Sequence, residues 1–442
     1  MNMKPLTKVL SALSLLLSLA AQGQSLTLEQ LIDKALTNNL SVQAARFDEA
    51  KTEARIAEVK AGALPLVNLT GDYKRYLKIP GQVVPASAFG GQEGTYQVLA
   101  FGLPYNLSTS VQASQAIYNP SLTIGLKAAK TSREVSTLQT RQTKEDVAYN
   151  VAATYYNLQT TVQQMAFLRR NIVSSDRLIQ ITDLQRQNQL AKGVDVDRLR
   201  LSKTASETQI ESLQATYNQL LNMLKYLTGT PQSEPLTVQT TIDETIPAVT
   251  LDAPAINRTD LLLLDRQKAL NSLDQQNIKA GFMPIVSAYG VANSTVYATG
   301  GEYSYIKNVP GYWLGLQLNW SVFDGFARKA KLTQKRLDNQ KLDTQLQQTR
   351  ESITMDITNA RNKLLVEQRN LTTNGAQVSL AEKIYSQTQL QFKEGTVSVS
   401  EVIQTEDELH NAQNNYLSTL VKFRSAELDW KKATGNLIAT KQ

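Results

Sequence analysis

The sequence has no cysteine and a single histidine, His410, among its 442 residues. Disulfide frameworks and thiolate metal sites are therefore excluded. A Ser-His-Asp or Cys-His catalytic arrangement would depend on His410 alone, and no thiol nucleophile exists. We expect no cofactor, no metal and no enzyme activity, with His410 at the surface of a helix. Glycine and proline, at 21 and 12 residues, are too scarce for a fibrous or disordered chain.

Clustered charge of one sign is also lacking, although the formal net charge is +7. Basic and acidic residues are interspersed along polar segments, as in Arg169, Arg170, Asp176 and Arg177, which is typical of solvated helices. A nucleic-acid groove would need grouped Lys and Arg with aromatic residues between them. The sequence therefore predicts no nucleic-acid partner.

The segment 1–23 has the organisation of a secretory signal peptide. Lys4 and Lys8 precede an apolar run at residues 9–21, and the small residues Ala21 and Gly23 suggest cleavage before Gln24. The run is shorter than the ~20 residues that a membrane-spanning helix needs. We expect an exported protein that is periplasmic, secreted, or inserted in an outer membrane as a β-barrel.

Self-comparison reveals an internal duplication. The motif Gly62-x-x-Pro65 recurs as Gly281-x-x-Pro284 in the second half of the chain. Three further pairs keep the same order: residues 117–120 with 322–325, 191–194 with 393–396, and 227–229 with 433–435. We infer a first repeat at 24–229, a Pro-rich linker at 230–257, a second repeat at 258–435 and a C-terminal tail at 436–442.

Each repeat contains segments in which the hydrophobic period is two. In residues 312–322 one face carries Tyr312, Leu314, Leu316, Leu318 and Trp320, and the other carries small or polar residues together with Trp313. A similar alternation covers 103–114, and weaker partners follow the Gly-x-x-Pro turns at 66–76 and 285–297. The pattern is typical of a membrane barrel strand. A half-buried strand of a soluble sheet has the same period, so pattern alone leaves both interpretations open.

Long helical segments surround these four strands. Residues 121–189 contain no proline, and apolar positions recur at steps of three and four residues, which predicts coiled-coil packing. Further helices are expected at 28–61 and 258–280. At ~1.5 Å per residue, fifty helical residues would extend about 75 Å.

Four strands are too few to close a transmembrane barrel, since the smallest have about eight. An open edge in hydrocarbon would leave backbone groups unpaired at several kcal/mol each. Two copies of the chain would give a filled barrel, and three would give twelve strands with room for a lumen. A homotrimer with cyclic symmetry is the favoured interpretation.

The chain resembles the TolC-like outer-membrane efflux proteins over nearly all of its mature length. The following residues carry the resemblance: Leu26, Thr27, Leu28, Glu29, Ala35, Leu36, Asn39, Gly62, Pro65, Tyr118, Asn119, Pro120, Gly281, Pro284, Phe323, Asp324, Gly325, Gly395, Ser398, Glu401, Val402, Leu409, Ala412, Asn414, Tyr416, Phe423, Ala426, Ala433, Thr434 and Gly435.

The resemblance implies an α+β membrane protein of the Gram-negative outer membrane. Four β-strands per chain would enter a trimeric 12-stranded β-barrel, continued by long antiparallel coiled-coil helices that form a periplasmic tunnel. Such a trimer is a passive exit channel of a tripartite efflux pump for small molecules, working with a periplasmic adaptor and an inner-membrane pump or transporter, and surrounded by outer-membrane lipid. The alternatives are an exit duct for type I protein secretion and, less favoured, a periplasmic coiled-coil scaffold without a pore.

The resemblance also indicates where the functional residues lie. The periplasmic entrance would be formed at the helical turns of Gly193 and Gly395, with Asp195, Asp197 and Glu401 as candidate acidic rings that favour cations. Ordinary charge at helix N-termini explains the two aspartates equally well. Val397 stands where well-known relatives have a gating Arg. Tyr312, Trp313 and Trp320 are candidates for the aromatic belt at the membrane interface, with packing within the sheet as the alternative.

Overall fold

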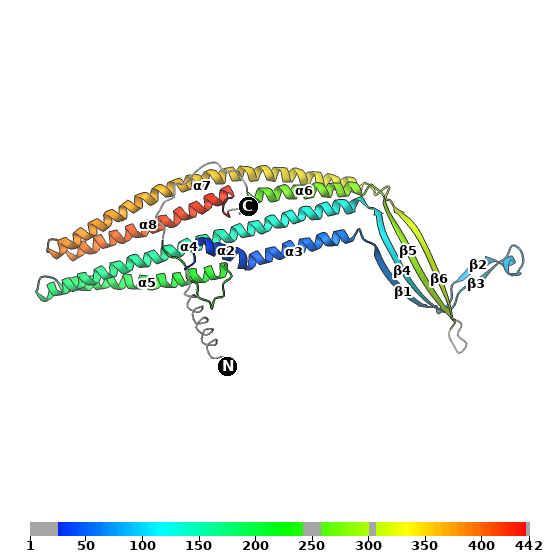
Figure 1. Ribbon diagram of the computed structural model, residues 1–442, viewed down its shortest axis with the longest axis horizontal. Helices are drawn as coiled ribbons and strands as arrows, with labels where there is room; N and C mark the ends of the chain where they lie inside the picture. Colours follow the sequence, from blue (N-terminus) through cyan, green and yellow to red (C-terminus); the bar gives the residue numbers. More distant parts are fainter. Residues whose placement is uncertain (1–24, 242–257, 300–305, 439–442) are drawn as a thin grey trace, which may run out of the picture. The chain divides into compact units, whose positions relative to one another are not determined.

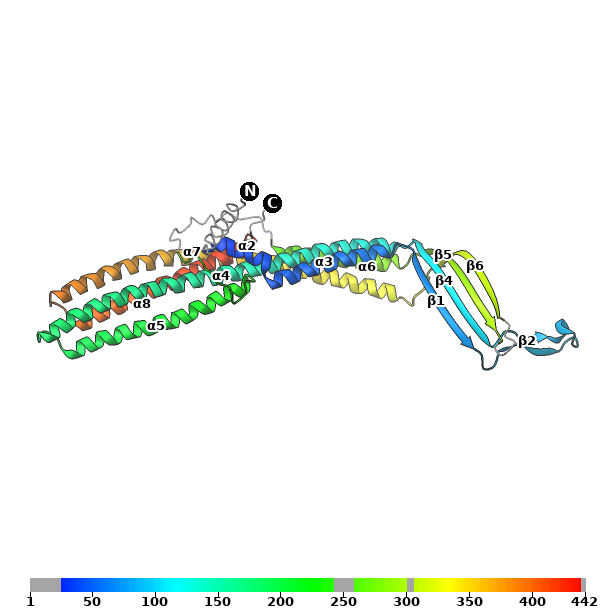
Figure 2. The same cartoon turned by 60° about the horizontal axis from the view of Figure 1, so that its bottom comes forward.

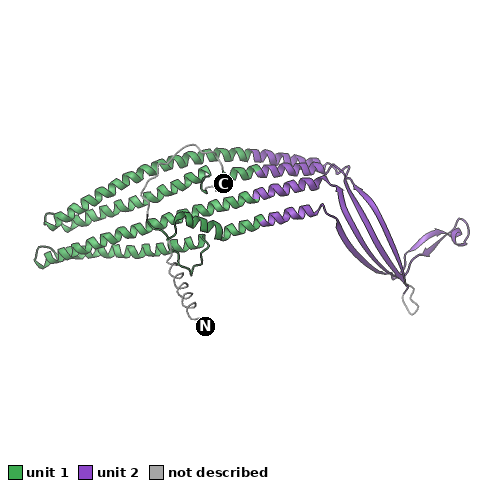
Figure 3. Ribbon diagram, viewed as in Figure 1, with its two compact units in different colours: residues 1–49, 136–265, 344–442 green, residues 50–135, 266–343 purple. Residues whose placement is uncertain are grey.

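The computed structural model describes residues 25–241, 258–299 and 306–438. The predicted signal peptide and residues 242–257 of the predicted linker lie outside this part. The chain divides into two compact units (Figure 3). Unit 1 comprises Met1–Glu49, Ser136–Asp265 and Thr344–Gln442, and unit 2 comprises Ala50–Val135 and Arg266–Asp343.

Both halves of the chain contain helix, strand, strand, long helix and second helix in the same order (Figure 1). The elements of the first half are α2 (Leu28–Asn38), α3 (Leu40–Ala61), β1 (Leu66–Arg75), β4 (Tyr105–Tyr118), α4 (Pro120–Gln187) and α5 (Gly193–Leu227). Those of the second half are α6 (Thr259–Ala280), β5 (Ile285–Ala298), β6 (Ile306–Asn319), α7 (Ala327–Lys393) and α8 (Val399–Thr434). The helical and strand segments expected from the sequence are thus present.

The bounds of β4 and β6 and one connecting segment differ from the sequence-based expectation. The strand expected at 103–114 is β4, which continues to Tyr118. The strand expected at 312–322 is β6, which begins earlier, at Ile306, and ends before Trp320. The segment between β1 and β4, for which the sequence indicated no strand, contains β2 (Gly81–Pro85), the short 3-10 helix η2 (Ala86–Phe89) and β3 (Tyr96–Ala100). β2 and β3 form a separate two-stranded sheet, which short runs of mixed residues did not reveal.

Unit 1 is a helical body in which α4 and α5 form one antiparallel hairpin and α7 and α8 form another (Figures 1 and 2). In α7, Leu346, Ile353, Ala360 and Leu364 are all buried at heptad-like spacing, which is typical of coiled-coil packing. The four clusters of buried apolar residues found in the described part of the chain all lie in unit 1.

Asn39 joins the short helices of unit 1 to the end of α5. Its side-chain oxygen accepts hydrogen bonds from the backbone N–H groups of Ser41 at 2.9 Å and Val42 at 3.3 Å, so it caps α3. Its amide nitrogen donates to the buried carbonyl of Leu227 at 2.8 Å. One side chain therefore satisfies the ends of two helices that are far apart in the sequence.

Unit 2 contains an antiparallel sheet in the order β1-β4-β5-β6 (Figure 2). β1 and β6 pair on one side only, so each leaves a row of backbone donors and acceptors unpaired within the described chain. Of the helices described, none contains a stretch of apolar residues long enough to cross a membrane.

The strand register separates the sheet into two chemically different faces. Pairing places Leu69 opposite Val111, Val111 opposite Ala292, and Ala292 opposite Tyr312 on one face. On this apolar face many large side chains are solvent-exposed, among them Val111 at 40% and Leu314 at 89%. The other, polar face carries Asn68, Thr70, Ser108, Ser110, Gln112, Asn293, Thr295, Gln317 and Asn319. The alternation seen in the sequence is therefore a property of the whole sheet.

Candidate functional site

The turns at the ends of the two long hairpins share one backbone geometry. After α4, Gln189 adopts a left-handed φ of 61°, and the N–H of Leu190 donates to the carbonyl of Gln185 at 2.7 Å. After α7, Gly395 has a φ of 76°, and the N–H of Thr396 donates to the carbonyl of Gln391 at 3.0 Å. A left-handed residue followed by this long-range bond is a Schellman motif, which ends a helix.

This geometry corrects the pairing expected between Gly193 and Gly395. The structural counterpart of Gly395 is Gln189, which lies before Gly193 in the chain. The same spacing along the sequence relates Gly229 to Gly435, which both have left-handed φ values. Gly193 is instead the first residue of α5. The comparison of the two repeats matched glycine with glycine, whereas in the structure the matching residues are those with a left-handed φ. Gln189 is one of them, and this backbone conformation costs a non-glycine residue ~1–2 kcal/mol.

The corrected register makes Asp195 and Glu401 equivalent, each at the third position of its helix. The backbone N–H of Lys192 donates to the Asp195 carboxylate at 3.3 Å. In the second turn Ser398 provides the cap, because its hydroxyl accepts from the N–H of Glu401 at 3.3 Å. Both carboxylates therefore lie in the first turn of a helix, where the macrodipole favours negative charge.

The three candidate acids differ in how their charge is compensated. Asp195 lies 3.9 Å from the Arg198 guanidinium, and Asp197 lies 3.8 Å from that of Arg200. Glu401 is exposed, and no ion pair joins it to any residue of the described chain. Of the three, Glu401 offers the least compensated negative charge at the turns.

A polar bridge connects the two hairpins near the turns. Arg198 on α5 donates from Nη1 to the hydroxyl of Ser400 on α8 at 2.9 Å. Beside this bridge lies an open groove of about 500 Å³. Its lining residues come from α5 and α8: Arg198, Leu201, Ser202, Ala205, Ser400, Ile403 and Asp407.

Val397 packs against an apolar cluster that includes Val399, Val402 and Phe392. The position where some relatives have an Arg thus contributes to a hydrophobic contact here. His410 is half-buried on α8, and burial lowers its pKa below the usual value. Within the described residues, no group of three or more potential metal ligands is found.

Glu406 is a functional candidate that the sequence analysis did not select. It is 5% exposed, and one carboxylate oxygen accepts a hydrogen bond from Ser175 on α4 at 2.8 Å. The other oxygen, Oε2, has no hydrogen-bond partner among the described residues. Burial raises the pKa of Glu406, and the Ser175 hydrogen bond opposes that rise. A sequence signal does place Glu406 in the helix interface. Buried positions of α8 recur at steps of four and three residues, in the series Val402, Glu406, Leu409 and Gln413.

The candidate interface aromatics do not share one environment. Tyr312 lies on the apolar face and is 78% exposed, whereas the adjacent Trp313 points to the polar face by strand alternation. Trp320 follows β6, and its indole N–H donates to the carbonyl of Phe282 at 3.0 Å. The register thus separates Trp313 from Tyr312, and Trp320 lies outside the sheet.

The family model described as "Outer membrane efflux protein" matches residues 31–230 and 264–436. Among solved structures, the Campylobacter jejuni CmeC outer membrane channel is 14% identical with a TM-score of 0.74, covering 94% of this chain and 87% of CmeC. The open state of the Neisseria gonorrhoeae MtrE outer membrane channel is 16% identical with a TM-score of 0.70, covering 94% and 90%. The search of curated protein sequences gave no match.

The helical hairpins and the two-faced sheet form the same fold as these outer-membrane channels. The chain belongs to the outer membrane efflux protein family. It is a protein of the Gram-negative outer membrane whose helices lie in the periplasm.

Proposed function

We propose that three copies of this chain form a passive exit channel through which small molecules leave the periplasm. The observation that carries the proposal is the sheet of unit 2, with one exposed apolar face, one polar face and two open edges. Successive strands in the order β1-β4-β5-β6 run antiparallel. β6 of one copy is therefore oriented to pair antiparallel with β1 of the next, and three copies supply twelve strands without a free edge.

In this assembly the apolar face meets outer-membrane lipid and the polar face surrounds water. The helical hairpins of unit 1 would continue the duct as a periplasmic tunnel. A periplasmic adaptor and an inner-membrane pump would supply substrate and energy, and the channel itself would perform no chemistry. The groove between α5 and α8 gives the adaptor a surface with both charged and apolar residues.

The turns would form the periplasmic entrance of the trimer. Threefold symmetry converts each Glu401 into a ring of three carboxylates, which attracts cations and repels anions. Asp195 and Asp197 contribute less, because arginines on the same helix lie within ion-pair distance. Glu401 is thus the residue expected to dominate ion selectivity.

Single-channel conductance in planar bilayers tests this proposal. The purified protein should form cation-selective pores, and Glu401→Ala should lose much of that preference while still conducting. Glu211→Ala is the matched control, because it removes one carboxylate from α5 at a position several turns beyond the start of that helix. Unchanged selectivity in Glu401→Ala would remove the ring from the proposal. Absence of any conductance would contradict the channel itself and favour a scaffold.

A further inference from the structure

Two aromatic side chains stand out on the polar face of the sheet. Trp313 on β6 pairs with Val291 on β5, and Tyr289 on β5 pairs with Gly315 on β6. Both rings lie on the same side as Asn293 and Thr295, because all these positions are odd-numbered on their strands and the register is continuous. Thr295 donates a hydrogen bond to Asn293 at 3.1 Å, so the surrounding surface is polar.

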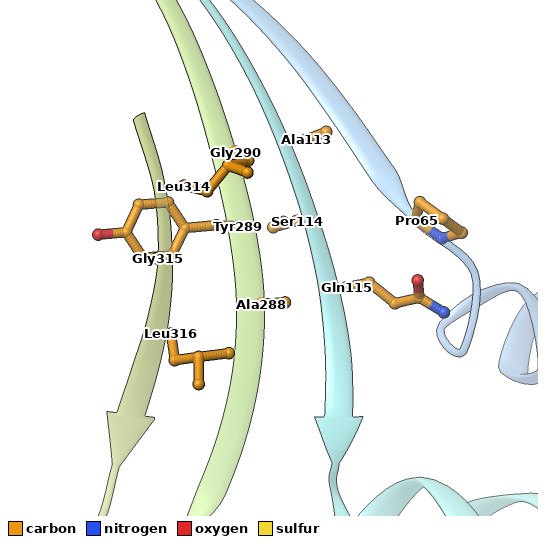
Figure 4. Close-up of a pocket in the computed structure, with 10 residues that line it drawn as sticks. All are labelled: Pro65, Ala113, Ser114, Gln115, Ala288, Tyr289, Gly290, Leu314, Gly315 and Leu316. Atoms are coloured by element: carbon orange, nitrogen blue, oxygen red, sulfur yellow. The ribbon is translucent and has the colours of Figure 1, made fainter. Parts of the chain in front are cut away.

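Glycines in β6 give these rings their positions. A Cβ added at Gly315 would meet the Tyr289 ring at 2.8 Å, which shows that the ring lies directly over the glycine backbone. Figure 4 shows the Tyr289 ring extending from β5 across β6 at Gly315. A Cβ at Gly311 would lie 3.5 Å from the Trp313 indole. The Trp313 indole thus lies beside Gly311, and the ring of Tyr289 from β5 lies over Gly315, both along the same face of β6.

The opposite face of the same strands has a different character. Leu314 covers Gly290, and small residues of β4 and β5 leave a shallow apolar groove of about 580 Å³ in that region. Gly290, Leu314 and Leu316, which line this groove, belong to the face that the proposed barrel turns toward lipid, and Tyr289 and Gly315 also border it. The register places the side chains of Tyr289 and Trp313 on the face that surrounds water. By the same register Tyr297, farther along β5, also lies on this face. Tyr289 and Trp313 are distinguished from it by their positions over and beside the glycines of β6.

We propose that Tyr289 and Trp313 form a contact site on the inner wall of the channel for planar aromatic small molecules. This inference rests on the proposed function and narrows its substrate class. Trp313 is 48% exposed, so much of its indole is free to stack against a passing ring. Aromatic stacking attracts planar molecules with little dependence on their other groups, and cationic rings gain further from the π-face. Three copies would supply six such rings around the lumen.

The orientation of Trp313 can be measured first. The chain has three tryptophans, so Trp320→Phe combined with Trp430→Phe leaves Trp313 as the only indole. In reconstituted vesicles its fluorescence should be quenched by aqueous acrylamide and not by brominated phospholipid. Strong quenching by brominated lipid would place the ring outside the barrel and overturn the contact site.

Binding is then measured with rhodamine 6G as the planar aromatic probe and its block of single-channel current as the readout. Trp313→Ala and Tyr289→Ala should each raise the half-blocking concentration about tenfold, the size expected for loss of one stacking partner. Tyr289→Phe should retain block, because the ring remains. Tyr312→Ala, on the opposite face, is the matched control and should behave like the parent channel.

The outcomes separate this inference from the proposed function. A conducting channel whose block is the same in the parent, Trp313→Ala and Tyr289→Ala proteins would overturn the aromatic contact site and leave the exit channel intact. A parent protein that forms no pore would overturn the channel, and the contact site with it. Weaker block in both alanine variants, with parent-like Tyr312→Ala, supports the site.

Discussion

Unit 1 and unit 2 handle their apolar side chains in opposite ways. In unit 1 Phe423 is 1% exposed and Leu158 is fully buried, each within helices of the same chain. In unit 2 Leu314 is 89% and Leu69 is 71% exposed on a sheet with two open edges. The helical unit satisfies its hydrophobic residues within one polypeptide. The sheet requires lipid and neighbouring copies, and this difference is the physical basis of the assembly.

The largest effect is expected in the helical core. Phe423→Ala removes a buried ring from the α7–α8 cluster and should lower the free energy of unfolding by about 3–5 kcal/mol. Denaturant unfolding followed by circular dichroism measures it. Phe47→Ala is the control, because Phe47 is 73% exposed in the same unit and its loss should change stability by less than about 0.5 kcal/mol. Equal losses in the two variants would contradict the assignment of the core.

A charge placed on the exposed apolar face of the sheet should have the next largest effect. It should impair insertion into the membrane and leave the stability of the helices unchanged. Leu314→Arg should cost about 2–4 kcal/mol if it faces the bilayer midplane. Folding yield into lipid vesicles measures this cost. Gln317→Arg on the polar face of the same strand should insert nearly normally. If both variants inserted equally well, the two faces would not differ in their contact with lipid.

Replacing the buried carboxyl of Glu406 in unit 1 should have a smaller effect, on how the free energy of unfolding depends on pH. Burial raises the pKa of Glu406 above its ordinary value of 4.5, so folding favours the protonated carboxyl. The stabilisation from this protonated form is complete below pH 4.5, and it is lost as the pH rises through the pKa of Glu406 in the folded protein. The nearby charge of Asp407 acts in the same direction, and Tyr385 on α7 faces the same carboxyl. Glu406→Gln should remove this pH dependence and be about 1 kcal/mol more stable than the parent at neutral pH.

Denaturant titrations in acidic and in neutral buffer measure the difference. Glu408→Gln, an exposed carboxylate on the same helix, serves as the control and should keep the pH dependence of the parent. If Glu406→Gln and the parent showed the same change between the two buffers, ionisation of Glu406 would not affect the α4–α8 contact.

The smallest expected effect tests the corrected alignment of the turns. Gly395→Ala introduces a Cβ at a left-handed position and should destabilise the hairpin by about 1 kcal/mol. Gly193→Ala should be neutral or slightly stabilising, because Gly193 begins α5 without a left-handed φ. Thermal unfolding of the two variants compares them. Similar destabilisation in both would restore the equivalence that the sequence suggested.

Much of the fold was predictable because its patterns are local and long. The steps of three and four in α4 and the period of two in β6 each run over many residues, so single exceptions do not hide them. The β2–β3 sheet escaped prediction because such short strands carry too little pattern. The turn register escaped because it depends on which residue adopts a left-handed φ, and Gln189 does so without being glycine.

The candidate site was predictable in part for the same physical reasons. Sequence placed Asp195 and Glu401 beside the turns, and Arg198 follows Asp195 at the i, i+3 spacing of one helix, which is a local signal. The hydrogen bond from Arg198 to Ser400 joins two distant segments, so the sequence alone did not indicate it. Glu406 was overlooked as a core residue because it is charged, although its spacing from Val402 and Leu409 is that of an interface position. For Trp313, residue type suggested the membrane interface, while its place in the strand alternation indicated the opposite face.

The central claim is that three identical chains pair the open edges of their sheets, β6 of one with β1 of the next, into one closed barrel. Native mass spectrometry of detergent-extracted protein tests it most directly, because each full-length chain contributes 48.9 kDa before any processing. The account predicts a species of three chains that dissociates only when the sheet unfolds. A monomer that remains in water without detergent would contradict it.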